Sequence, residues 1–270
     1  MDKKYIIETK NLTKQYGSQK SVADLNIHVQ RGRIYGLLGR NGAGKTTTMK
    51  MLLGLTKPTS GEVKIWGKAL QGNEKKLLPR IGSLIESPGF YPNLTATENL
   101  RIFATLRGVP NNHAIKDALD LVGLPYKDKK LFSQNSLGMK QRLAIALAVM
   151  HDPELLILDE PTTGLDPQTR LLIWDIIEKL RVEEKLTVFL TTHYMEEAAN
   201  AGYVVILDKG SIVAEGTPFE LKNEYVQDTM SVYGVTEEEI KTLGREYKKI
   251  RDGYQLKVCL LYTSDAADDK

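Results

Sequence analysis

The sequence predicts an α/β fold, in which strands and helices alternate along the chain. Short apolar runs at 34–39, 155–158 and 204–207 are typical of buried strands, and helical patterns follow the first two of them. Alternation of this kind predicts a largely parallel sheet covered by helices. The chain has 270 residues, 41% of them hydrophobic, which is enough to fill the core of such a domain.

The remaining elements can be expected in order along the chain. Alternating runs at 5–12 and 21–29 predict antiparallel strands ahead of the first buried strand. A helix is predicted from Lys45 to about Leu53, where Gly54 ends it. The other expected elements are a short strand within 58–68, helices between about 95 and 150 with breaks at 108–110 and 123–125, a helix at about 168–182, a strand at 187–191 and a helix after His193.

Composition and charge exclude several classes of protein. The 37 Lys+Arg and 34 Asp+Glu residues leave a net charge of +3, without the strongly basic footprint of a nucleic-acid-binding protein. The single Cys259 excludes a disulfide framework and a zinc site, and indicates a reducing compartment. No run approaches the roughly 18–20 apolar residues that span a bilayer, and the N-terminus has no signal-peptide pattern. If the protein acts in membrane transport, another chain must supply the channel.

A glycine-rich segment, Gly39-Arg40-Asn41-Gly42-Ala43-Gly44-Lys45-Thr46, fits the template G-x-x-x-x-G-K-[ST] between a strand and a helix. Its glycines allow backbone N–H groups to surround an anion, and the helix N-terminus adds partial positive charge. Lys45 is expected to contact the β- and γ-phosphates of a nucleotide, and Thr46 to ligate Mg²⁺. The predicted nucleotide-binding residues here are Gly39, Asn41, Gly42, Ala43, Gly44, Lys45, Thr46 and Thr47. The motif alone is shared with kinases and GTPases.

Further motifs accompany this loop, and together they resemble the ATP-binding-cassette (ABC) family over about residues 5–217. They are Tyr16, Asn135–Arg142, the apolar run Leu155–Leu158 leading into Asp159-Glu160, Gly164-Leu165-Asp166 and Thr191-Thr192-His193. The resemblance implies a P-loop NTPase core with an antiparallel β subdomain and an inserted α-helical subdomain at about 88–150.

The resemblance also implies roles for these residues, with ATP and Mg²⁺ as cofactors. Asp159 would hold the metal together with Thr46, and Glu160 would act as general base on the attacking water. His193 would contact the γ-phosphate and complete a catalytic set with Glu160 and Lys45. Tyr16 would stack on adenine. An acidic turn after a strand, a structural histidine and an ordinary turn tyrosine are the alternative interpretations.

Other positions would act between two copies of the chain. By the resemblance, Ser136, Gly138 and Met139 belong to a signature segment that binds the γ-phosphate held by the opposite subunit. The segment is degenerate, because Leu137 and Met139 replace the usual glycine and glutamine. Ser136 can also be a helix N-cap, and the two roles are compatible. Asp166 would line the dimer interface.

The chain departs from the family at Glu86, which stands where the Q-loop glutamine is usual. A carboxylate adds negative charge beside Mg·ATP and, when ionised, only accepts hydrogen bonds. Metal ligation, positioning of water, or an exposed loop residue without a role all remain open. With the segments at 90–95 and 136–141, the substitution resembles the ATPase subunits of bacitracin- and lantibiotic-type exporters.

We therefore expect the energy-coupling subunit of a bacterial exporter that expels a peptide antibiotic, a lantibiotic or a similar amphiphile. Two copies would clamp head to tail around ATP, at the cytoplasmic face of the membrane. A separately encoded permease would dock near Glu86–Tyr91, and no nucleic acid is expected. The alternative is a soluble ABC ATPase of translation or DNA maintenance, which usually carries paired cassettes, a coiled-coil insert or basic linkers. A P-loop kinase would not need the signature segment or His193.

The predicted domains are a nucleotide-binding domain at 1–217, a truncated C-terminal extension at 218–258 and a foreign tail at 259–270. After 217 the pattern weakens, and the chain becomes polar and mixed. The run from Cys259 to Asp268 is unlike the rest and is typical of a translated sequencing adapter. A natural polar tail is the alternative. On the first interpretation, Cys259 does not belong to the natural protein.

Overall fold

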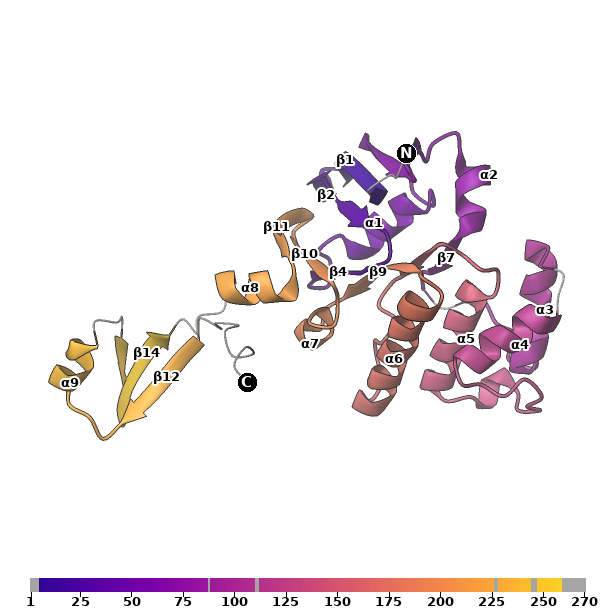
Figure 1. Ribbon diagram of the computed structural model, residues 1–270. Coiled ribbons are helices and arrows are strands. Elements are labelled where there is room, and N and C mark those ends of the chain that lie inside the picture. Colours follow the sequence, from indigo (N-terminus) through magenta and orange to yellow (C-terminus); the bar gives the residue numbers. More distant parts are fainter. Residues whose placement is uncertain (1–4, 87, 110–111, 226–227, 244–246, 259–270) are drawn as a thin grey trace, which may run out of the picture. The chain divides into compact units, whose positions relative to one another are not determined.

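The computed structural model describes residues 5–86, 88–109, 112–225, 228–243 and 247–258 (Figure 1). The chain divides into two compact units, Met1–Pro218 and Phe219–Lys270. The tail at 259–270, with Cys259, lies outside the described residues. Within the described ranges, no helix has the length and apolar character needed to cross a membrane.

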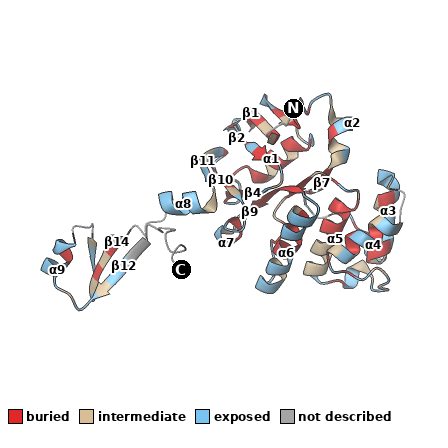
Figure 2. Ribbon diagram, in the orientation of Figure 1, coloured by how far each residue is buried: buried red, intermediate tan, exposed pale blue. Residues whose placement is uncertain are grey.

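A six-stranded sheet forms the centre of the first unit, in the order β11-β10-β4-β9-β8-β7. Its strands are β4 (Ile34–Gly39), β7 (Ile81–Leu84), β8 (Leu155–Leu158), β9 (Thr187–Thr192), β10 (Tyr203–Asp208) and β11 (Ser211–Gly216). Neighbouring strands are parallel, except that β11 runs antiparallel to β10. Every residue of β4, β8 and β9 is buried, as in sheets covered on both faces (Figure 2). Of these strands, β7 and β11 were not predicted from the sequence.

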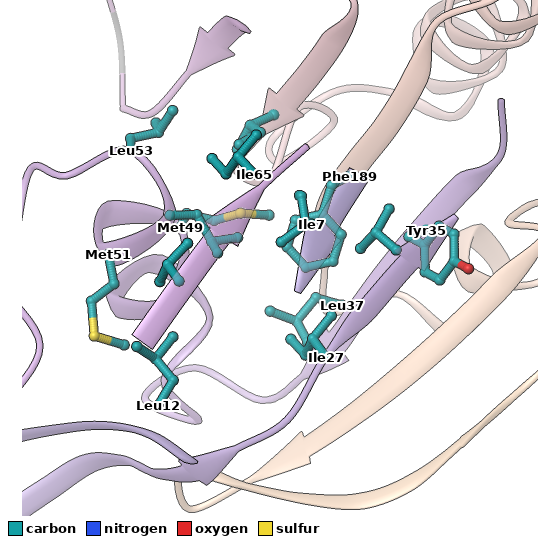
Figure 3. Close-up of a cluster of buried hydrophobic side chains, with 14 of the residues drawn as sticks. Ile7, Leu12, Ile27, Tyr35, Leu37, Met49, Met51, Leu53, Ile65 and Phe189 are labelled. Carbon is teal, nitrogen blue, oxygen red and sulfur yellow. The ribbon is translucent and has the colours of Figure 1, made fainter. Parts of the chain in front are cut away.

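An antiparallel sheet precedes and flanks this core. It contains β1 (Tyr5–Tyr16), β2 (Gln19–Leu25), β3 (His28–Gln30), β5 (Ser60–Ile65) and β6 (Lys68–Ala69). Helix α1 (Lys45–Leu52) contacts both β2 and β4. Ile7 of β1, Met49 of α1 and Phe189 of β9 are fully buried in one hydrophobic cluster (Figure 3). Because both sheets and α1 share this core, the loop before α1 is held at a fixed place above the sheet.

Helices α5, α6 and α7 lie on the face of the central sheet opposite to α1 (Figure 1). Between β7 and β8 the chain forms α3 (Ala96–Arg107), α4 (Asn112–Leu121) and α5 (Leu137–Val149), and after β8 it forms α6 (Pro167–Glu183) and α7 (Met195–Ala198). Helices α3 and α4 contact α5, which contacts β7, while α6 and α7 contact β9. The insertion lies within the range that the sequence analysis assigned to a helical subdomain. A short α2 (Glu74–Leu77) precedes β7.

The second unit has regular structure that the sequence analysis did not expect. It comprises most of α8 (Pro218–Tyr225), β12 (Asp228–Tyr233), α9 (Glu237–Thr242), β13 (Tyr247–Ile250) and β14 (Gly253–Val258). The three strands form an antiparallel sheet in the order β12-β14-β13. Its small core joins Ile240 of α9 to Tyr254 and Leu256 of β14.

Candidate functional site

The glycine-rich loop connects β4 to α1, and at each end a glycine leaves no room for a side chain. Gly44 has a φ of 103°, and a Cβ atom there would lie 2.4 Å from the carbonyl oxygen of Ser21. A Cβ atom on Gly39 would lie 2.7 Å from the carbonyl oxygen of Leu207. Gly42 has a φ of 81° and no atom near its Cβ position. The loop therefore closes tightly at both ends, while Asn41 and Gly42 in its middle stay exposed.

The loop is tied down by neighbours outside the motif. The carbonyl oxygen of Ala43 accepts a hydrogen bond of 3.0 Å from the backbone of Gly210. The hydroxyl groups of Thr47 and Ser21 lie 3.0 Å apart. These contacts link the start of α1 to β2 and to the turn between β10 and β11, so the loop keeps its shape.

Lys45 turns back over its own loop towards the end of β8. Its Nζ atom donates to the carbonyl oxygens of Gly39 (2.8 Å) and Arg40 (3.2 Å), and it lies 3.1 Å from a carboxylate oxygen of Glu160. The side chain is only 4% exposed. A buried ammonium needs such partners, and an anionic phosphate would serve it equally well.

Thr46 and Asp159 meet at the carboxyl ends of the parallel strands. The hydroxyl of Thr46 donates to Asp159 over 2.7 Å. The hydroxyl of Thr191 donates a hydrogen bond of 2.6 Å to the other oxygen of Asp159. It also accepts a hydrogen bond of 2.8 Å from the backbone N–H of Glu160. One hydroxyl beside one carboxylate suits Mg²⁺, which usually takes few protein ligands and completes its shell with phosphate and water. The residues therefore fit the predicted metal.

Glu160 stands at the centre of the polar contacts of the site. Its backbone has a left-handed φ of 46°. Its Oε2 atom accepts a hydrogen bond of 3.0 Å from the hydroxyl of Thr163. The Nδ1 atom of His193 lies 3.5 Å from the same oxygen. Partial burial by itself raises the pKa of Glu160, but hydrogen bonds from Lys45 and Thr163 outweigh it, so the pKa lies below its ordinary value. The carboxyl is ionised at neutral pH.

Glu86 is held by a different partner. Lys50 of α1 donates to its Oε1 atom over 2.8 Å, and this hydrogen bond lowers the pKa of Glu86. The Glu86 side chain is 69% exposed, and its backbone has a left-handed φ of 62°. No hydrogen bond joins it to Thr46 or Asp159 within the described structure. Its predicted part in metal binding stays a prediction.

The signature segment contacts α6 rather than the glycine-rich loop. Ser136 is the N-cap of α5, and its hydroxyl accepts a hydrogen bond of 3.3 Å from the backbone N–H of Met139. A Cβ atom on Gly138 would lie 2.5 Å from Cγ2 of Thr169. Asp166 caps α6 and accepts from both the backbone and the hydroxyl of Thr169 (3.0 and 2.6 Å). Ser136 and Asp166 are both exposed, which leaves them accessible to a second copy of the chain.

Tyr16 lies at the end of β1, and the residue is 53% exposed. The Nζ atom of Lys14 lies 4.9 Å from the ring centre. A face of the ring thus remains available for a flat ligand, as the adenine role requires.

Several site residues carried no signal of their own. Thr191 lies inside a motif but had no predicted role, and Thr163, Lys50 and Thr169 were not singled out. Thr163 and Thr169 each bond a predicted residue three positions earlier, Glu160 and Asp166 respectively. Lys50 and Thr191 bond Glu86 and Asp159 from other parts of the chain. Thr191 is near the end of β9, the strand that pairs with β8. Only this position could have indicated its contact with Asp159, which follows β8.

Comparison with known proteins matches residues 22–163 to the family model described as ABC transporter. Over 216 residues the chain is 53% identical to the bacitracin transport ATP-binding protein BcrA of Bacillus licheniformis, covering 80% of this chain and 70% of that protein. The chain belongs to the ABC transporter family. A BcrA protein of Enterococcus faecalis is 50% identical over 218 residues, covering 80% of this ABC transporter chain and 71% of that protein.

Solved ABC proteins also share the fold. The cbiO1 protein of Clostridium perfringens, described as part of the ABC transporter complex cbiONQ, has a TM-score of 0.74 at 26% identity, covering 81% of this chain and 91% of that chain. The ATP-binding cassette MJ0796, solved as a dimer bound to ADP and Pi, has a TM-score of 0.70 at 26% identity. The match covers 78% of this chain and 98% of that chain. The predicted fold class and the resemblance to ABC ATP-binding subunits of the bacitracin type are confirmed.

Proposed function

We propose that this ABC protein hydrolyses Mg·ATP to drive a bacterial exporter of a peptide antibiotic or a similar amphiphile. The observation that carries the proposal is the meeting of Lys45, Glu160, Thr46 and Asp159 at one edge of the parallel sheet. These side chains come from the two segments that a phosphoryl-transfer site requires, a phosphate loop and an acidic strand end.

Each residue has a defined task in this mechanism. The N–H groups of the glycine-rich loop and Lys45 bind the phosphates. Lys45 therefore gives up its ion pair with Glu160 when it contacts the nucleotide. Bound Mg²⁺ would supply a positive charge that neutralises the phosphate oxygens, held by Thr46 and Asp159. Glu160, freed and ionised, accepts a proton from the attacking water. His193, beside Glu160, donates to the γ-phosphate.

A second copy of the chain would complete the site. The contacts given for Ser136 and Gly138 in the described chain are with Met139 and Thr169, and Ser136 is exposed at the start of α5. A hydroxyl and backbone amides at a helix start are suitable ligands for a phosphate. Asp166 lies exposed at the start of the neighbouring α6. The dimeric state of MJ0796 supports the same arrangement here.

The cargo is inferred from relatives rather than from a cargo-binding site. The two BcrA proteins, at 53% and 50% identity, are described as bacitracin transport proteins. The described part of this chain has no membrane-spanning helix, so a separate permease would form the pathway. The chain would then act at the cytoplasmic face of the membrane as a peripheral subunit.

A groove in the first unit is suited to a permease segment. It has a volume of about 530 Å³ and is lined by Leu53, Leu55 and Leu78, with Arg107 and His151 at its polar side. The Nη1 atom of Arg107 lies 2.8 Å from Nδ1 of His151, and no carboxylate of the described chain pairs with this arginine. The Arg107 side chain is exposed, and partial desolvation of its guanidinium lowers its pKa. An apolar helix bearing one carboxylate would cover the leucines and pair with the guanidinium.

Steady-state hydrolysis by the full chain tests the catalytic part of the proposal. We expect phosphate release that requires Mg²⁺, is lost on adding a chelator, and is reduced in Glu160→Gln. Hydrolysis that persists without Mg²⁺ or in the variant would contradict it. Co-expression with a permease encoded beside its gene should raise bacitracin resistance, and an unchanged resistance would contradict the proposed cargo.

A further inference from the structure

The residue after His193 makes contacts that the catalytic roles do not explain. Tyr194 follows β9 and forms the N-cap of α7. Its ring centre lies 4.1 Å from that of His193, with 37° between the ring planes. Its backbone N–H donates to the hydroxyl of Thr192 (3.0 Å), which itself donates to the buried Glu197 (2.7 Å). The backbone beneath Tyr194 is therefore fixed, and its ring stands against the imidazole.

A cation from another helix covers the Tyr194 ring. The guanidinium carbon of Arg170, near the start of α6, lies 4.6 Å from the ring centre. The Nε atom of Arg170 is buried and has no hydrogen-bond partner within the described structure. Leaving such a donor unpaired has a free-energy cost, so the contact with the aromatic face is the interaction that the fold provides for this group.

His193 needs an external constraint on its ring. Its Nδ1 atom is buried without a hydrogen-bond partner among the described residues, and the Glu160 carboxylate is 3.5 Å away. A metal-free histidine is usually oriented by a hydrogen bond to one ring nitrogen. Here the described polar contacts do not supply that bond, while an aromatic ring at 4.1 Å does limit the rotation of the imidazole.

We propose that Arg170 and Tyr194 form a stacked pair that positions His193 for its contact with the γ-phosphate. Both are positioning residues, which act through His193 and not on the substrate. The proposal rests on the proposed ATP hydrolysis for its kinetic consequence, but its geometric claim concerns the ring of His193 alone.

The pair also connects His193 to α6. Asp166 caps this helix through Thr169, and the backbone N–H of Arg170 donates to the carbonyl oxygen of Asp166 over 2.9 Å. A partner subunit that presses on Asp166 would thus move the same turn of helix that carries Arg170. The stacked pair then transfers this movement to His193.

Nuclear magnetic resonance of histidine-labelled protein tests the geometry without turnover. Ring resonances of His193 are assigned by comparison with His193→Gln. We expect Tyr194→Leu and Arg170→Gln each to shift them, because the first removes the neighbouring ring and the second releases it. Arg181→Gln is the matched control on the same helix, where Arg181 pairs with Glu178, and it should leave them unchanged. His193 resonances unmoved by Arg170→Gln would overturn the proposal.

Kinetics tests the positioning role. A misplaced catalytic group lowers turnover with little effect on binding, so Tyr194→Leu should reduce kcat about tenfold while KM for ATP stays within about twofold. Tyr194→Phe keeps the aromatic face and should recover most of the rate. In a His193→Ala background, Tyr194→Leu should have no further effect. Additive losses, or equal losses in Phe and Leu variants, would overturn the proposal. If the wild-type chain does not hydrolyse ATP, the proposed function is contradicted. The resonance experiment would still decide whether Arg170 and Tyr194 position His193.

Discussion

The side-chain amine of Lys45 lies 3.1 Å from a carboxylate oxygen of Glu160. One residue begins α1 and the other follows β8, so the contact joins the phosphate loop to the acidic strand end. The phosphates of ATP would compete with Glu160 for Lys45. In the proposed mechanism, binding of the nucleotide would therefore also release Glu160 to act as general base.

Removing the Lys45 amine should weaken nucleotide binding. We expect Lys45→Ala to lower the affinity for ATP at least about tenfold, equivalent to about 1.4 kcal/mol, measured by calorimetric titration. Lys179→Ala is the matched control, since Lys179 forms an exposed ion pair with Glu183 on α6. Equal affinities in the two variants would count against the role of Lys45.

Glu160 should make the folded state sensitive to acid. Burial opposes its ionisation, but Lys45 and Thr163 hold its pKa below the ordinary value of 4.5. A carboxyl with a lowered pKa stabilises the fold above its unfolded value, and this contribution is lost as the pH falls through the folded value. Between about pH 7 and about pH 3, urea unfolding should show a smaller loss of free energy in Glu160→Gln than in wild type. Parallel losses would show that the carboxylate contributes nothing.

Gly138 should tolerate no methyl group while Thr169 is present. Alanine is about 1 kcal/mol more favourable than glycine within a helix, but its Cβ would lie 2.5 Å from Cγ2 of Thr169. Overpacking of this kind costs about 1–3 kcal/mol, so Gly138→Ala should be net destabilising in thermal unfolding. Thr169→Ser removes Cγ2 and keeps the hydroxyl that bonds Asp166. The double variant should regain the loss, and a stable Gly138→Ala alone would refute the close contact.

Arg107 should matter for assembly and not for hydrolysis. If a carboxylate of the permease pairs with it in the groove beside Leu55, Arg107→Glu should abolish co-purification of the two proteins. The ATPase rate of the isolated chain should stay within about twofold, because Arg107 contacts His151 and no residue of the nucleotide site. Arg101→Glu is the control, because Arg101 is exposed on the same helix, contacts Tyr126 and does not line the groove. Intact co-purification of Arg107→Glu would argue against this docking groove.

The sequence predicts those parts of the site that lie in short continuous motifs. Gly39 to Thr46 and Asp159-Glu160 are of this kind, because strand, turn and helix signals surround them. Contacts between distant segments carry no such signal. Lys50 with Glu86, Thr191 with Asp159 and Arg170 with Tyr194 became visible only in the folded chain.

In the first unit, two strands were missed for reasons that the packing explains. β7 has four residues, one of them Gly82, where a Cβ atom would lie 2.2 Å from the carbonyl oxygen of Ala148 in α5. Its composition therefore reflects close contact with a helix and not strand propensity. β11 is an edge strand in which exposed residues alternate with partly buried ones and only Gly216 is buried, so it lacks the apolar run of its neighbours.

The association state of Glu160→Gln tests the central claim most directly, because a shared site requires two chains once ATP is bound and not hydrolysed. Light scattering of the purified variant should show a monomer alone and a dimer with Mg·ATP. Adding Ser136→Ala, on the facing signature segment, should weaken that dimer. A Glu160→Gln chain that binds ATP and stays monomeric would contradict the account.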